Sequence, residues 1–267
     1  MTYVTSDLHG YPFEKFQALL NSVGFSENDM LYILGDVVDK GKDGIKYLQW
    51  SLDTPNVTLL LGNHEDMLRR YEFLFDPDKE DITPYLHGEE EYRLCIWTEE
   101  GGTPTLEGLC GISAAERAEL GLYLYSLPAY LKINVGGKDF LLVHSGLGEF
   151  SPDKRLDEYE LYEMIWDRAR LTDKYFDDVT TIFGHTPTLF YGAEYSGKIL
   201  FTDTWIDIDV GVAAGFPPVL LQLDDMQQFS CEDRRADLQR VAQHKKNGRR
   251  TDGVRLPFFL LYKRKAR

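Results

Sequence analysis

Histidine, aspartate and asparagine recur in this sequence at five places, each directly after a short apolar run. The five stretches read SDLHG at 6–10, GDVVD at 35–39, GNHE at 62–65, HSG at 144–146 and GHTP at 184–187. Together they contain four of the six histidines of the chain. Any one of these stretches could be an ordinary polar turn. Five of them in equivalent positions indicate that they act together.

This mixture of side chains favours a centre of two divalent ions. Imidazole, carboxylate and amide oxygen ligands without a thiolate suit manganese, iron, zinc or nickel. Two ions about 3.5–4 Å apart need a carboxylate between them to offset their repulsion, and Asp36 of the second stretch is the natural bridge. Asp7 and His9 would complete the first ion. The ligands expected for the second ion are Asn63, His144 and His185.

The apolar runs that precede these residues predict the strands that position them. The runs are short and β-branched or aliphatic, as buried strands are, and they cover residues 3–5, 31–34, 57–61, 140–143 and 179–183. Helical patterns lie at 12–20, 44–52 and 65–75, and this alternation predicts a parallel sheet covered by helices. Ligands of such α/β sheets bind beyond the carboxyl ends of the strands, where the loops converge.

The second half of the chain predicts further strands, which we expect to be antiparallel. Residues 130–143 form two strand-like runs joined across Gly136-Gly137, a strong hairpin signal. Residues 197–211 and 217–225 also look like strands. We expect one catalytic domain over residues 1–228, with a helical and loop-like insertion at about 76–128. A basic extension over 229–267 would follow it as part of the same domain.

The charge and composition limit the classes of partner. The formal net charge of −15 over 267 residues argues against a protein whose main task is to bind nucleic acid. From His244 onward, however, nine Lys and Arg face one Asp. This basic tail either pairs with the acidic body or anchors an acidic partner, and the sequence leaves both open. Three widely spaced cysteines, no secretory signal and no apolar stretch of membrane-spanning length predict a cytoplasmic protein without membrane contact.

Taken together, the five stretches resemble the binuclear metallophosphoesterases, and above all the compact bacterial and phage serine/threonine phosphatases of the PPP type. The resemblance covers residues 1 to about 225. It implies the α/β calcineurin-like fold, in which central mixed sheets form a β-sandwich flanked by helices. It also implies two bound divalent metals, with manganese expected first. The implied ligands are Asp7, His9 and Asp36 for one metal and Asp36, Asn63, His144 and His185 for the other.

The same resemblance implies roles for the residues around the metals. A hydroxide bridging the two ions would attack phosphorus in line, and His64, paired with Asp39, would protonate the leaving alkoxide. Trp166-x-Arg168 resembles the element that grips phosphate in these enzymes. Lys40 stands where the family has arginine, so it is expected to contact phosphate through one point charge rather than a planar fork. The residues expected to bind the substrate phosphate are Asn63, Arg168 and Lys40.

One further stretch, IWTEEGGTPTL at 96–106, resembles an element of the bacterial members and is expected on the substrate side of the site. The activity expected first is that of a serine/threonine protein phosphatase acting on a phosphorylated protein or a small phosphoester. Two alternatives of the same fold are a symmetrical dinucleoside tetraphosphatase and a phosphatase of nucleic-acid ends. The acidic body disfavours both, because their substrates are polyanions. A relative without activity that serves as a binding scaffold is a different class, but the complete ligand set argues against it.

Overall fold

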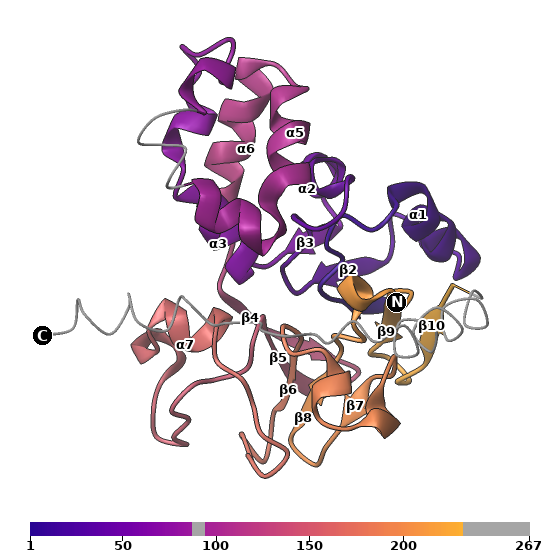
Figure 1. Ribbon diagram of the computed structural model, residues 1–267. Helices are drawn as coiled ribbons and strands as arrows, with labels where there is room; N and C mark the ends of the chain where they lie inside the picture. Colours follow the sequence, from indigo (N-terminus) through magenta and orange to yellow (C-terminus); the bar gives the residue numbers. More distant parts are fainter. Residues whose placement is uncertain (87–93, 232–267) are drawn as a thin grey trace, which may run out of the picture. The chain divides into compact units, whose positions relative to one another are not determined.

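The computed structural model describes residues 1–86 and 94–231, which contain two β-sheets with helices packed along them (Figure 1). The first sheet has the strand order β10-β9-β1-β2-β3, and the second has the order β4-β5-β6-β8-β7. Each sheet contains both parallel and antiparallel neighbours. The mixed-sheet sandwich expected from the sequence is therefore confirmed.

Three parallel strands at one end of the first sheet carry the first three polar stretches. Thr5 pairs with Ile33, and Ile33 pairs with Leu59, so the three strands end level with one another. Their loops consequently leave the sheet at the same edge. The strands are β1 (Thr2–Thr5), β2 (Met30–Ile33) and β3 (Val57–Leu59), and the antiparallel neighbours are β9 (Val219–Gln222) and β10 (Gln228–Ser230).

The helices between these strands bury one apolar face each. Helix α1 (Phe13–Ser22) begins directly after Pro12, as the sequence predicted, and α2 (Gly44–Asp53) also agrees with its pattern. The prediction of a helix over 65–75 is wrong in its bounds. Helix α3 spans Asn63–Arg69, and a separate 3-10 turn follows at Glu72–Phe75, because Tyr71 leaves the helical region with φ −96° and ψ 63°.

The second sheet carries the last two polar stretches. The predicted hairpin is present, and Gly136 and Gly137 both take positive φ, as a two-residue type I′ turn requires. Strands β5, β6 and β8 run parallel, whereas β4 and β7 are antiparallel to their neighbours. The strand bounds are β4 (Tyr130–Val135), β5 (Lys138–Val143), β6 (Thr180–Phe183), β7 (Leu200–Phe201) and β8 (Trp205–Asp207).

Residues of the expected insertion are mostly helical and pack beside α2 and α3 (Figure 1). A π-helical turn at Thr98–Gly102 leads into α5 (Thr103–Cys110), and α6 (Ala114–Ser126) follows with Ser113 as its N-cap. Leu109 and Leu124 belong to the same buried apolar cluster as Ile33 of β2. The insertion therefore shares a core with the first sheet.

The alternation of side chains along the strands explains how the layers pack. Phe140 and Leu142 of β5 join Val4 and Leu221 in the core between the two sheets. Leu141 and Val143, which alternate with them along β5, point to the other face, where they pack with the segment that contains α7 (Leu161–Ile165). Both faces of β5 are thus buried, as its continuous apolar run indicated.

Two expectations concern the ends of the described chain. Strand β10 reaches Ser230, slightly past the expected domain end at 228. Most of the basic extension over 229–267 lies outside the described residues. Within the described ranges, no helix has the length and apolar character needed to cross a membrane.

Candidate functional site

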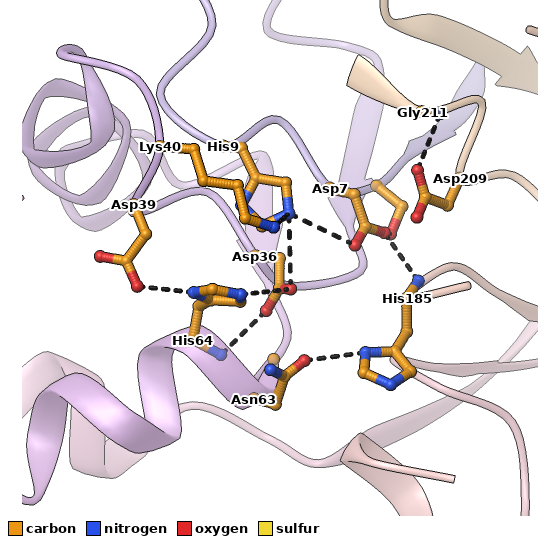
Figure 2. Close-up of polar contacts among 12 residues, drawn as sticks. Asp7, His9, Asp36, Asp39, Lys40, Asn63, His64, His185, Asp209 and Gly211 are labelled. Carbon is orange, nitrogen blue, oxygen red and sulfur yellow. Dashed lines mark hydrogen bonds and ion pairs between the residues drawn. The ribbon is translucent and has the colours of Figure 1, made fainter. Parts of the chain in front are cut away.

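The five polar stretches meet where the strands of both sheets end. Figure 2 shows this for residues of four of them, among them Asp7, Asp36, Asn63 and His185. Loops after β1, β2 and β3 approach from the first sheet, and loops after β5 and β6 approach from the second. Every residue expected to bind a metal is buried. For clarity, Asp7, His9 and Asp36 are called the first group. The second group consists of Asp36, Asn63, His144 and His185.

The side chains of the second group converge closely. Asn63 Oδ1 lies 2.9 Å from His144 Nε2 and 2.8 Å from His185 Nδ1. Asp36 Oδ1 lies 3.4 Å from His144 Nε2. Asp36, His144 and His185 each offer a ligand atom within 4.8 Å of the others, close enough for one ion.

The hydrogen bond of His144 to the backbone shows what this convergence is suited to. Its Nδ1–H donates to the carbonyl oxygen of Leu34 at 2.6 Å, so in the neutral ring Nε2 carries a lone pair. That lone pair faces the oxygens of Asn63 and Asp36, which are acceptors as well. Three acceptors pointing at one another fit a bound cation, and this donor set suits a borderline divalent metal.

The side chains of the first group are spaced more widely than those of the second, and a lysine lies beside them. His9 Nδ1 donates to the carbonyl oxygen of Val38 at 3.1 Å, which directs Nε2 toward the carboxylates. His9 Nε2 lies 3.8 Å from Asp36 Oδ2 and 4.0 Å from Asp7 Oδ1. The ammonium of Lys40 lies 3.0 Å from the same nitrogen. These residues also fit a divalent ion, but with wider spacing than the second group.

Burial and neighbouring charges lower the pKa values of two of the histidines, which is the direction that a metal ligand requires, because a histidine binds a metal in its neutral form. Burial first, and then His144, lowers the pKa of His185 well below its usual value. Burial and then Lys40 lower the pKa of His9 in the same way, so both rings are neutral and can bind a metal. Burial, followed by Asp7 and Glu65, raises the pKa of Asp36. A bound cation would relieve this crowding of carboxylates.

His64 and Asp39 form the pair that the sequence predicted. His64 Nδ1–H donates to Asp39 Oδ2 at 2.6 Å, and its Nε2 lies 3.8 Å from Asp36 Oδ2 (Figure 2). His9, Asp36 and His64 are close enough to share an ion, so His64 could be a ligand by distance alone. Its carboxylate partner and its place beside both groups equally suit a proton donor.

The backbone at the site is strained in a way that is rare elsewhere in the described residues. Eight of their non-glycine residues have positive φ, and six of these lie in the site. Left-handed backbone costs about 1 kcal/mol or more for such residues, and such strain clusters at functional sites. The six are Asp7, His9, Asp36, Asp39, Lys40 and His185.

A buried glutamate holds the loop that carries Asp36. Glu65 Oε2 accepts the N–H groups of Asp36 at 2.7 Å and Gly62 at 3.1 Å, and Oε1 accepts those of Val37 and Val38. Gly35, with φ 87°, lies so close to Gly62 that a Cβ there would collide with its backbone. The GNHE stretch thus supplies two site residues, Asn63 and His64, and through Glu65 it supports the neighbouring loop.

The two expected phosphate-binding cations lie on different sides of the site. Arg168 Nη1 donates to Thr186 Oγ1 at 3.0 Å, and Thr186 follows His185 directly, which places Arg168 beside the second group. Lys40 lies beside the first group through its contact with His9. A phosphate between the groups could therefore meet one cation from each side.

Sequence reasoning missed one buried acid at the site. Asp209 follows β8, and Figure 2 places it near Asp7. Its Oδ1 accepts the N–H of Gly211 at 2.9 Å, and burial, then Asp7, raises its pKa. The signal was present, because Asp209 stands after a strand like the other site residues. In the sequence, however, it falls within the strand-like run 197–211.

Comparisons with known proteins agree with this arrangement. A model of the calcineurin-like phosphoesterase family matches residues 2–208. A protein named symmetrical bis(5′-nucleosyl)-tetraphosphatase from Haemophilus ducreyi is 28% identical over 239 residues, which are 88% of this chain and 71% of that protein. A protein of the same name from Acidovorax sp. is 29% identical over 54% of this chain and 43% of its own length. This second match thus spans less than half of the relative.

Two solved structures share the fold. One, described as a candidate diadenosine tetraphosphatase, matches with a TM-score of 0.58 at 19% identity and covers 86% of this chain and 92% of its own. A serine/threonine phosphatase from Saccharomyces cerevisiae matches with a TM-score of 0.51 at 15% identity, over 86% of this chain and 79% of its own. At these identities both support the architecture.

Proposed function

Because this chain belongs to the calcineurin-like phosphoesterase family, we propose that it is a metal-dependent hydrolase that cleaves dinucleoside tetraphosphates symmetrically. The observation that carries the choice of substrate is the similarity over 88% of the chain to a protein of that name. The serine/threonine phosphatase activity expected first from the sequence stays a prediction. The relatives favour the alternative.

The two groups would hold the metal ions that the family uses. Bound there, two divalent ions would lower the pKa of a water molecule and offset the charge of the phosphoryl oxygens. The tautomers of His9 and His144 are set by their hydrogen bonds to Val38 and Leu34, so each ring presents its Nε2 to the site. Asp36 contributes one oxygen to each group, which suits a bridging ligand.

The reaction requires one bond to form and one to break. A water oxygen forms a bond to a phosphorus atom of the tetraphosphate, and the bond from that phosphorus to the central bridging oxygen breaks. The electron pair stays on the departing nucleoside diphosphate, and cleavage at the centre yields two nucleoside diphosphates. His64, held by Asp39, would donate a proton to the departing oxygen.

The cations of the chain would bind the polyanionic substrate. Lys40 and Arg168 flank the first and second groups respectively, so successive phosphates could contact both. Arg168 is exposed, and its guanidinium can grip two oxygens, whereas Lys40 offers a single charge. These local cations offset the acidic character of the whole chain, which had counted against a polyanionic substrate.

A comparison of kcat/KM tests this proposal. The protein with Mn²⁺ is assayed on diadenosine tetraphosphate and on phosphoserine and phosphothreonine peptides. We expect the dinucleotide to be preferred by at least about a hundredfold and to yield only ADP. Preference for the peptides would restore the protein phosphatase prediction. No turnover of any substrate with manganese, iron, zinc or nickel would favour a binding scaffold.

A further inference from the structure

The Asp39 carboxylate is held by two residues of the insertion as well as by His64. Asp39 Oδ2 accepts the indole N–H of Trp97 at 2.8 Å, in addition to His64 Nδ1–H. Its Oδ1 accepts the hydroxyl of Thr105 at 2.7 Å, and the same hydroxyl oxygen accepts the backbone N–H of Asp39 at 2.8 Å. Asp39, Trp97 and Thr105 are almost fully buried. Both oxygens of the carboxylate are therefore tied to the insertion.

The stretch between these two residues is shaped to reach Asp39. The ring of Trp97 stacks on Tyr71 with centroids 5.4 Å apart, and Gly102 passes so close to the indole that a side chain there would collide with it. Gly101, with φ 105°, accepts the backbone N–H of Lys40 through its carbonyl at 2.8 Å. The glycine pair of TEEGGTPTL thus allows a π-helical turn to lie against the Asp39-Lys40 loop.

We propose that Trp97 and Thr105 are positioning residues that fix the Asp39 carboxylate, so that His64 keeps its Nε2 directed at the site as the proton donor. This inference rests on the proposed hydrolase function but not on the choice of substrate. The expectation that IWTEEGGTPTL lies on the substrate side stays a prediction, and two of its residues, Trp97 and Thr105, point at Asp39. The stretch acts through Asp39 and His64.

The physical reason is the number of donors that Asp39 receives. A carboxylate can rotate about its last bond, and each rotation changes the direction in which it holds an imidazole. Here a rotation would break the bonds to Trp97 and Thr105 together, and both would leave buried polar groups without partners. The two donors therefore restrict the orientation of His64 without touching the substrate.

Three substitutions separate this role from general support of the fold. Trp97→Phe keeps an aromatic ring next to Tyr71 but removes the N–H donor. Thr105→Val keeps the shape but removes the hydroxyl, and Thr105→Ser restores it. Trp205→Phe is the matched control, because Trp205 is fully buried in the second sheet and its indole N–H donates to the carbonyl oxygen of Asp173 at 2.9 Å.

The assay compares phenyl phosphate, whose leaving group needs a proton, with 4-nitrophenyl phosphate, whose leaving group departs without one near neutral pH. We expect Trp97→Phe and Thr105→Val to lower kcat for phenyl phosphate at least about tenfold, and for 4-nitrophenyl phosphate by no more than about threefold. KM and bound Mn²⁺ should stay unchanged. Thr105→Ser should restore the rate, and Trp205→Phe should leave the ratio of the two substrates as it is.

Equal losses on both substrates, or a loss of bound metal, would overturn the inference and leave a purely structural role. A second readout does not depend on turnover: in the NMR spectrum, the downfield proton on His64 Nδ1 should shift or broaden in Thr105→Val and recover in Thr105→Ser. An unmoved resonance would also overturn it. If the wild type hydrolyses both aryl phosphates but not diadenosine tetraphosphate, and the variants show the expected losses, the proposed substrate fails while this inference stands.

Discussion

The two groups of expected metal ligands differ in the origin of their residues. The first group comes from the loops after β1 and β2, which are neighbouring strands of the first sheet. The second group combines Asp36 and Asn63 from the first sheet with His144 and His185, which follow strands of the second. A cation bound by the second group would therefore link the sheets, whereas one bound by the first group would mainly link two adjacent loops.

The candidate ligand atoms are also closer together in the second group than in the first. The distances given above are 2.8–3.4 Å in the second group, whereas His9 Nε2 is 3.8 and 4.0 Å from the carboxylates of the first. The first group also has the ammonium of Lys40 next to its histidine. We expect the second group to bind metal more tightly, because its ligand atoms are already close together, whereas Lys40 lies against His9 of the first group.

Removing a ligand of the second group should reduce the activity more than any other change. His144→Ala removes a ligand and the hydrogen bond to Leu34, so we expect kcat/KM to fall at least about a thousandfold. Calorimetry should show that the tight Mn²⁺ site has disappeared. His9→Ala should also lose activity but keep one tightly bound ion. If His9→Ala loses the tight site and His144→Ala keeps it, the comparison between the groups is reversed.

The next largest effect is expected for His64, which is paired with Asp39. His64→Asn should lower kcat for phenyl phosphate by about a hundredfold or more, because proton donation to the leaving group is lost. The variant should still bind two Mn²⁺ ions, measured by metal analysis after gel filtration. This result separates the two roles that the distances allow for His64. Loss of one ion would make His64 a ligand of the first group rather than a proton donor.

Asp39 gives a prediction on pH that can be checked without metal. Burial raises the pKa of Asp39 to about 6, although Thr105 and Trp97 oppose the shift by donating to the carboxylate. The folded protein therefore holds this proton more tightly than the unfolded chain, whose aspartates titrate near 3.9. Between about pH 4 and pH 6 the unfolded state loses the proton first, so the contribution of Asp39 to stability falls as the pH rises.

Asp39→Asn should remove this dependence. Relative to the wild type, the variant should gain up to about 3 kcal/mol in the free energy of unfolding between pH 4 and pH 7. Chemical denaturation of the metal-free proteins at both pH values measures it. A difference between the proteins that does not change with pH would show that Asp39 titrates in the folded protein as it does in the unfolded chain.

The smallest effect concerns Lys40. Removing its charge by Lys40→Ala should raise the Mn²⁺ affinity of the first group about threefold to tenfold, because a cation no longer lies 3.0 Å from His9 Nε2. The same variant should raise KM, and Lys40→Arg should lower it. Lys42→Ala is the control, since Lys42 is exposed two residues further along. Unchanged metal affinity in Lys40→Ala would remove one of the two proposed causes of the difference between the groups and leave only the spacing of the ligand atoms.

Much of this site could be predicted from the sequence because its residues follow strands directly. A short apolar run of three to five residues followed by a polar residue indicates both the strand and the edge at which the polar side chain lies. The pairing of His64 with Asp39 could also be expected, and the structure shows the contact. What could not be predicted is the close approach of Lys40 to His9, because it depends on positive φ at Asp39 and Lys40.

Other features depend on contacts between residues far apart in the chain. Trp97 and Thr105 reach Asp39 across about sixty residues, so spacing gave no sign of where IWTEEGGTPTL would lie. The role of Glu65 was hidden for a similar reason, since an acid in the first turn of a helix usually indicates capping. It does cap α3 through Gly62, but it also holds the Asp36 loop.

The most direct test of the two-group site is a titration of metal-free protein with Mn²⁺. Bound metal and the hydrolysis of diadenosine tetraphosphate are followed together. We predict two ions per chain that bind in sequence, activity that appears only as the second ion binds, and ADP as the only nucleotide product. Full activity with one ion per chain, or release of AMP and ATP, would contradict the account.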